Sequence, residues 1–284
     1  MSTSANLRTS LKRMTDDLAK LIVDTPIRRL NRSGGVIMVC PDYYWGDRNA
    51  QQVNAQMQLK RVFDGWLERL KISFKGAPDD IQHKLDEAEC NFRIWVEFDN
   101  NWQLCPDRSE NERRMRLKAN AFDKILDILD AGKSNGIIIV PDTNAIIKEP
   151  DPVQYRTLAG ANAFKFLLLP SVLSELDKLK NLHRNPDFRD KAEKVITRIK
   201  GWRKQGTLSV GVVVDQTIQV QALHNEPNMK STLTWLDPNV LDDRIVASLL
   251  EIQASSPADR VILVTGDINL QNKADAAAIE HSEL

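Results

Sequence analysis

The chain has 284 residues, of which 42% are hydrophobic and 27% charged, with 39 lysines and arginines against 39 aspartates and glutamates. This balance is typical of a folded protein of one or two domains and excludes general disorder. No run approaches the ~18 apolar residues that span a bilayer, and the first 33 residues lack the apolar core of a signal peptide. We therefore expect a cytoplasmic protein that does not contact membranes.

The cysteines Cys40, Cys90 and Cys105 form no CxxC pair and no cluster with histidine. This spacing argues against a zinc site or a disulfide framework. Free thiols are therefore expected.

Residues 1–135 are predicted to be mainly helical. Apolar residues recur at intervals of three and four over residues 51–75, which is the pattern of a helix with one buried face. A second such helix is predicted to start at Ser109, which has capping-box spacing to Glu112, and to end at Gly132. The role of this region stays open between substrate recognition, oligomerisation and regulation.

Shorter elements are predicted between these helices. Residues 16–30 have the pattern of a short helix. Two apolar segments are predicted to be strands, GVIMVC at residues 35–40 and FRIWVEF at residues 92–98.

The pattern changes near Asn135, where we place a boundary between domains of residues 1–135 and 136–284. Short apolar runs then alternate with helical stretches, and runs that are apolar on both faces indicate a parallel sheet covered by helices. This is an α/β fold. The predicted strands are residues 136–140, 166–170, 208–214 and 260–265, and the predicted helices are residues 171–180, 188–205 and 242–254.

Acidic side chains follow the predicted strands. Asp142 comes after the first of them, Glu175 lies in the helix after the second, and Asp267 comes after the last. Asp242 and Asp243 open the helix that leads to the last strand. Taken singly, an aspartate at such a place commonly caps a helix or a turn. Because ligands collect at the carboxyl ends of parallel strands, the four places together predict one acidic site.

Carboxylates brought together repel one another and raise each other's pKa values unless a cation neutralises them. The pattern therefore predicts a divalent metal ion. Because the ligands would be oxygens, without histidine or cysteine, Mg²⁺ or Mn²⁺ is favoured over zinc.

Four motifs in this order, PDTNAII, LPSVLSELDKLK, LDDRIVASLL and VILVTGDINLQNKA, resemble a PIN domain. This is the nuclease fold of bacterial toxin ribonucleases and of RNA-decay factors. The resemblance covers residues 136–281 and implies a parallel sheet between helices. It also implies hydrolysis of phosphodiesters, usually those of RNA, with Mg²⁺ or Mn²⁺.

The resemblance assigns roles to the acids. Asp142 corresponds to the first metal-binding acid, Glu175 to the acid on the helix and Asp267 to the last acid. The third acid is Asp242 or Asp243, with Asp242 as the first choice, so that all five are candidate catalytic and metal-binding residues. Three neighbours are candidates for hydrogen bonds that fix the carboxylates: Asn144, Thr265 and Asn269.

The chain departs from the PIN pattern in two ways. The fold usually closes with a strand after the helix that follows the last acid, and only residues 276–284 remain here, so that we expect this edge to be short or absent. Residues 1–135 lie outside the pattern. Because free toxins of this fold are shorter, the additional region suggests built-in control, by analogy in a toxin-like stress response or bacterial defence.

Residues 178–204 contain ten lysines and arginines against three acids. A basic strip directly after Glu175 is a candidate track for nucleic-acid phosphates, although a solvated helix face is the equal alternative. The candidate nucleic-acid-binding residues are Lys178, Lys180, Arg184, Lys194, Arg198, Arg203 and Lys204.

The leading hypothesis is a metal-dependent endoribonuclease that acts on single-stranded or structured RNA, transfer RNA included. A second copy of the chain and an inhibitory or regulatory protein are further candidate partners. The alternatives are a catalytically silent module for nucleic-acid binding or regulation, and a related DNA nuclease, because few contacts distinguish RNA from DNA. A phosphatase with a nucleophilic aspartate is disfavoured because Asn144 stands where its second acid is expected.

Overall fold

The computed structural model describes residues 2–30, 41–131, 136–182 and 184–284. The chain divides into two compact units, Ser4–Ala131 and Gly132–Leu284 together with the first three residues. The strand predicted at residues 35–40 lies outside the described residues. Within the described parts of the chain, no helix is long and apolar enough to cross a membrane.

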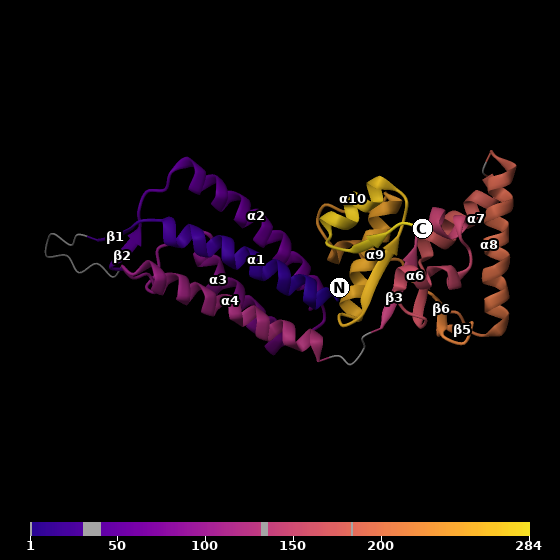
Figure 1. The fold of residues 1–284 in the computed structure, drawn as a ribbon, viewed down its shortest axis with the longest axis horizontal. Coiled ribbons are helices and arrows are strands. Elements are labelled where there is room, and N and C mark those ends of the chain that lie inside the picture. Colours follow the sequence, from indigo (N-terminus) through magenta and orange to yellow (C-terminus); the bar gives the residue numbers. More distant parts are fainter. Residues whose placement is uncertain (1, 31–40, 132–135, 183) are drawn as a thin grey trace. The chain divides into compact units, whose positions relative to one another are not determined.

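The first unit is built from long helices that run alongside one another (Figure 1), and their apolar faces form its core. A short antiparallel pair of strands lies between the first two helices in the chain. The elements are α1 (Thr3–Asp24), β1 (Ile27–Arg29), β2 (Tyr43–Trp45), α2 (Ala50–Ser73), α3 (Asp79–Val96) and α4 (Arg108–Asp130).

Aromatic side chains dominate this core. The rings of Trp66 and Phe122 meet edge to face with centroids 5.0 Å apart, and those of Phe63 and Phe92 are 5.3 Å apart. Because these four residues come from α2, α3 and α4, the cluster holds three helices together. On the surface, Arg8 of α1 pairs with three acids of α4, namely Asp123, Asp127 and Asp130.

Three predictions for this unit were wrong. Residues 92–98 are not a strand, because Phe92, Trp95 and Val96 are buried at helical spacing within α3. The helix predicted at residues 16–30 is longer at its start and begins at Thr3. It ends at Asp24 because Pro26 disfavours helical backbone at the residue before it. The helix cap is Asp107, which accepts from the amides of Ser109 and Glu110, rather than Ser109.

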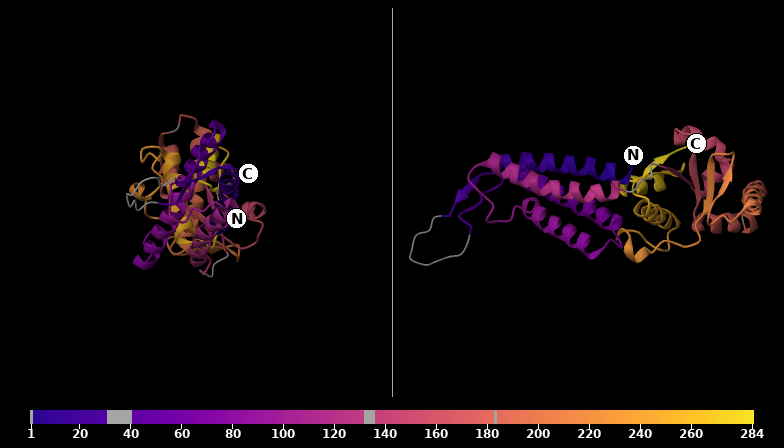
Figure 2. Two further views of the ribbon diagram at one scale, coloured as in Figure 1. Left: turned by 90° about the vertical axis from the view of Figure 1, so that its left-hand side faces the viewer. Right: turned by 90° about the horizontal axis from the view of Figure 1, so that it is seen from below.

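The second unit contains a six-stranded sheet with the order β5-β6-β4-β3-β7-β8. Every neighbouring pair is parallel except β5 with β6. Helices α8 and α9 lie on opposite sides of the sheet (Figure 2). The strands are β3 (Ile137–Pro141), β4 (Phe164–Leu168), β5 (Val212–Val214), β6 (Ile218–Ala222), β7 (Arg260–Val264) and β8 (Glu280–Ser282). The helices are α5 (Thr143–Lys148), the 3-10 turn η1 (Pro152–Tyr155), α6 (Arg156–Ala159), α7 (Pro170–Leu182), α8 (Pro186–Gln205), the 3-10 turn η2 (Met229–Ser231), α9 (Leu241–Ser255) and α10 (Ile268–Ala276).

The expected α/β fold is confirmed, with corrections at the β5–β6 edge of the sheet. Only the end of residues 208–214 forms a strand, and it is antiparallel. Strand β6 was missed because its sequence, IQVQA, alternates with glutamine instead of forming an apolar run. The other edge was expected to be short or absent, and it is short: β8 has three residues and pairs parallel to β7.

We predict that Phe122→Ala destabilises the helical unit by about 3–5 kcal/mol, because it removes a fully buried ring from the aromatic cluster. Urea unfolding followed by circular dichroism measures the change. Leu117→Ala on the same helix is the matched control, because Leu117 is 53% exposed. Equal effects of the two substitutions would contradict the central role of the cluster.

Candidate active site

Three acids meet at the carboxyl edge of the sheet because their strands are neighbours. Strand β3 lies between β4 and β7. Asp142 follows β3, Asp267 follows β7, and Glu175 lies in α7, which begins directly after β4. The topology thus places the acids from three sequence motifs around the end of one central strand.

Asp142 is the buried centre of this group, with 4% of its surface exposed. It caps α5 by accepting a hydrogen bond of 2.6 Å from the Ala145 amide, and its other oxygen accepts from the Thr265 hydroxyl. Burial raises the pKa of the Asp142 carboxyl, the charges of Asp267 and Glu175 raise it further, and the two hydrogen bonds oppose the rise. Asp142 therefore lies in the electrostatic field of Asp267 and Glu175.

Thr265 joins two of the acids. Its side chain is fully buried, and its hydroxyl donates to Asp142 while accepting a hydrogen bond of 3.0 Å from the Asp267 amide. The structure thus places Thr265 in the supporting position for which the sequence made it a candidate. Asp267 caps α10 through one oxygen, Oδ1, which accepts from the amides of Asn269 and Leu270.

Of the other two candidate supporting residues, only Asn269 forms a hydrogen bond to a carboxylate among the described residues. Asn144 is exposed, and no hydrogen bond of its side chain is present among the described residues. Its neighbour Thr143, which the sequence analysis did not single out, is buried and donates its hydroxyl to Glu175. Asn269 supports Asp267 through its backbone amide, at 2.7 Å, and its side chain is exposed.

Asp242 and Asp243 are held by a cation that the sequence analysis also missed. Lys273 of α10 lies 2.7 Å from Oδ1 of Asp243 and 3.3 Å from Oδ2 of Asp242. Partial burial lowers the pKa of Lys273, but the two carboxylates outweigh it, and the net shift is upward. Asp243 is 6% exposed and also accepts a 2.8 Å hydrogen bond from the Asp237 amide, whereas Asp242 is half-buried.

The donor set fits a divalent cation in its chemistry, because every candidate ligand is a carboxylate oxygen. The mutual repulsion that raises the pKa of Asp142 also favours a cation at this place. Across residues 2–30, 41–131, 136–182 and 184–284, however, no three acidic, histidine or cysteine side chains are gathered closely enough to hold a metal ion as they stand.

The candidate basic strip contains both paired and unpaired cations. Lys180 pairs with Glu193, and Arg198 pairs with Asp151 and lies over the Trp202 ring. The other five candidates make no ion pair with any residue that the structure describes: Lys178, Arg184, Lys194, Arg203 and Lys204. The unpaired members are the ones available to an anionic ligand.

Acidic side chains that follow neighbouring strands, at the carboxyl edge of a parallel sheet between helices, define an α/β domain with an acidic candidate site. The profile of the PIN domain family matches residues 139–284, slightly more than half of the chain, and the chain therefore belongs to the PIN domain family. Domains of this family are generally nucleases that use divalent metal ions. A comparison with curated proteins finds no significant match.

We predict that Asp142→Asn stabilises the fold at neutral pH. The folded-state pKa of Asp142 lies above its ordinary value of 3.8, so that ionised Asp142 destabilises the folded state. This destabilisation is lost when the pH falls below 3.8, because the carboxyl is then protonated in both the folded and the unfolded state. Thermal unfolding should therefore show a higher Tm for the variant at about pH 7 and no gain at about pH 3.5. The control is Asp79→Asn, at an exposed acid in the helical unit. A lower Tm for Asp142→Asn at neutral pH would contradict the prediction.

Proposed function

We propose that the protein is a metal-dependent endoribonuclease. The observation that supports this most is the buried Asp142 carboxylate, which lies in the field of Asp267 and Glu175 at the edge where ligands of parallel sheets bind. Membership of the PIN family supports nuclease chemistry. The unpaired cations on α7 and α8 support an anionic polymer as the substrate.

The chemistry follows from charge. A phosphodiester is an anion, and an acidic site repels it unless a cation lies between them. A bound divalent ion would supply charge neutralisation and a water of lowered pKa. In this proposal Asp142 and Asp267 bind the ion, and Glu175 completes its ligands or orients the attacking water. Thr265 and Thr143 fix the carboxylates through hydrogen bonds.

The same geometry distinguishes Asp242 from Asp243. Asp243 is buried between Lys273 and the Asp237 amide, so that moving it would break two close contacts. Asp242 is more exposed and its contact with Lys273 is longer. We therefore assign Asp242 to the metal site and Asp243 to the positioning of Lys273 and of the start of α9.

RNA is proposed rather than DNA because the PIN resemblance implies RNA as the usual substrate. The distinction requires experiment, since recognition of a 2′-hydroxyl needs few contacts.

We predict that the purified chain cleaves labelled RNA in Mg²⁺ or Mn²⁺ and that EDTA stops the cleavage. Asp142→Asn and Asp267→Asn should abolish it because each removes a proposed metal ligand, whereas Asp79→Asn should cleave as the wild type does. Thr265→Val should lower the rate by about 10–100-fold, because the carboxylates lose the hydroxyl that joins them. Gel analysis with single-stranded RNA, transfer RNA and single-stranded DNA in parallel measures these effects.

Three outcomes of this assay would contradict the proposal. Cleavage of DNA alone would indicate a DNA nuclease. Full activity of Asp142→Asn in Mn²⁺ would refute the site. Binding of RNA without cleavage under every metal condition would favour the silent binding module.

A second prediction separates the neighbouring aspartates. Asp243→Asn should lower the Tm, because it leaves Lys273 without its closest partner, while Asp242→Asn should lower cleavage with a smaller change in Tm. Thermal unfolding and cleavage rates of both variants are compared under the same conditions. The reverse order of effects would exchange the two assignments.

A further inference from the structure

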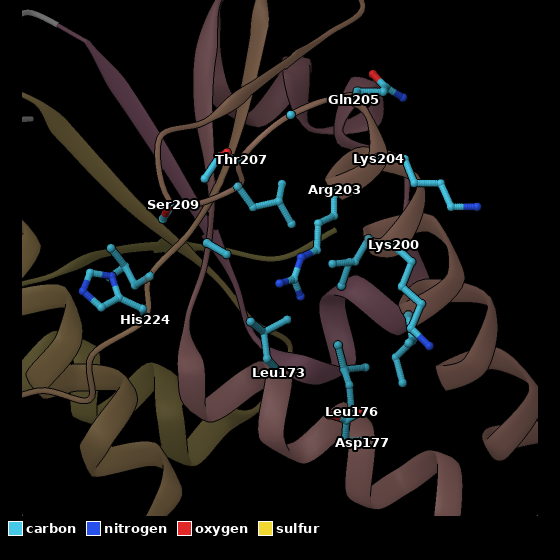
Figure 3. Close-up of a pocket in the computed structure, with 16 residues that line it drawn as sticks. Leu173, Leu176, Asp177, Lys200, Arg203, Lys204, Gln205, Thr207, Ser209 and His224 are labelled. Atoms are coloured by element: carbon cyan, nitrogen blue, oxygen red, sulfur yellow. The ribbon is translucent and has the colours of Figure 1, made fainter.

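A cavity of about 680 Å³ lies between α7, α8, the segment that follows α8, and the residues after β6 (Figure 3). Its volume falls within the range of about 300–1,000 Å³ that is typical of small-molecule sites. Apolar side chains form much of its wall, among them Leu173, Leu176, Ile196, Ile199 and Leu223. The cavity is thus large enough for one nucleoside and has a partly apolar wall for its base.

The polar part of the lining is mostly basic. Lys200, Arg203, Lys204 and His224 line the cavity together with one acid, Asp177. Figure 3 shows the Arg203 side chain pointing into the cavity, whereas Lys204 extends away from it. Among the residues that the structure describes, none of the three lysine and arginine side chains makes an ion pair.

These cations differ from the other basic cluster of the chain. On α4, Arg113 and Arg114 pair with Glu110, and Arg116 pairs with Asp16 and Glu112. Cations near the end of α8 suit the helix dipole, but the dipole does not explain an apolar cavity beneath them. An apolar wall under unpaired cations is complementary to an apolar ring that carries a phosphate.

The cavity and the acidic site share helix α7, although none of the candidate acids lines the cavity. Helix α7 carries Leu173 and Leu176 of the cavity wall, and Glu175 lies between them in the sequence. Strand β6 pairs with β4, so that the residues after β6 reach the same edge of the sheet as the start of α7. The cavity and the acids therefore lie at the same end of the sheet.

We propose that this cavity binds one unpaired nucleotide of the nucleic-acid substrate. The base lies against the apolar side chains of α7 and α8, and Arg203 binds a phosphate of the same strand. Because a base in a duplex cannot enter a cavity without leaving its pair and stack, the preferred substrate is single-stranded. This inference rests on the proposed function and narrows its substrate class.

Binding of fluorescein-labelled single-stranded RNA, measured by anisotropy with the full chain in EDTA, tests the proposal without cleavage. We expect Arg203→Glu to weaken binding by at least about tenfold. The matched control is Arg189→Glu, which makes the same charge change at an exposed position of α8 outside the cavity. We expect the control to have a much smaller effect.

A second variant tests the cavity without changing charge. Thr207→Trp fills the cavity from an exposed position of its wall, so that folding should be preserved. It should weaken binding of single-stranded RNA and leave binding of a duplex of the same length unchanged. Single-stranded DNA in parallel shows whether the cavity distinguishes the sugar.

Equal losses for Arg203→Glu and Arg189→Glu would overturn the proposal in favour of general electrostatic attraction. So would unchanged binding by Thr207→Trp, or an equal loss for duplex RNA. Failure of the nuclease proposal is distinct. Wild-type protein that binds single strands through the cavity but never cleaves them would refute the nuclease proposal alone. Cleavage by the wild type, with unchanged binding of single strands by both variants, would refute the cavity proposal alone.

Discussion

The site depends on keeping one charged carboxylate buried among other acids. Asp142 is almost inaccessible to solvent, and its pKa is raised by that burial and by two neighbouring acids, which is unfavourable for the fold. Hydrogen bonds from the neighbouring backbone and side chains offset this unfavourable burial. The Asp142 amide donates to the Val264 carbonyl at 2.9 Å, and the Asp142 carboxylate accepts from the Ala145 amide and the Thr265 hydroxyl. Stable strand pairing between β3 and β7 therefore holds an unfavourable charge in place, as is common at functional sites.

The distribution of cations divides the acids into two groups. Lys273 neutralises Asp242 and Asp243, whereas no ion pair among the described residues involves Asp142, Glu175 or Asp267. The latter group is thus left to a cation from outside the chain. Basic residues divide in the same way, since the arginines of α4 are paired internally and Arg203 is not. Unpaired charges of both signs therefore occur beside the carboxyl edge of the sheet.

The sequence predicted the central strands and the acids at their ends, because buried parallel strands are continuous apolar runs and their ends are marked by polar residues. It did not predict β6, where glutamines alternate with apolar residues, and it left open whether the closing edge, which is the three-residue strand β8, is short or absent. Lys273 and Thr143 were missed for another reason. Their roles come from tertiary proximity, to residues 30 or more positions away in the sequence, which no local pattern records. The segment at residues 92–98 was predicted wrongly for a different reason, because a short apolar run fits a strand and a buried helix equally.

Helix capping and metal binding are compatible roles for the strand-end aspartates. An ionised carboxylate has two oxygens with about four acceptor positions, so that capping uses only part of its capacity. In Asp267 a single oxygen, Oδ1, accepts from both cap amides, and in Asp142 each oxygen accepts one hydrogen bond. The caps fix the directions of the carboxylates while leaving acceptor positions open. The ordinary capping role that a strand-end aspartate suggests in isolation is thus the means by which this chain orients the acids of its candidate active site.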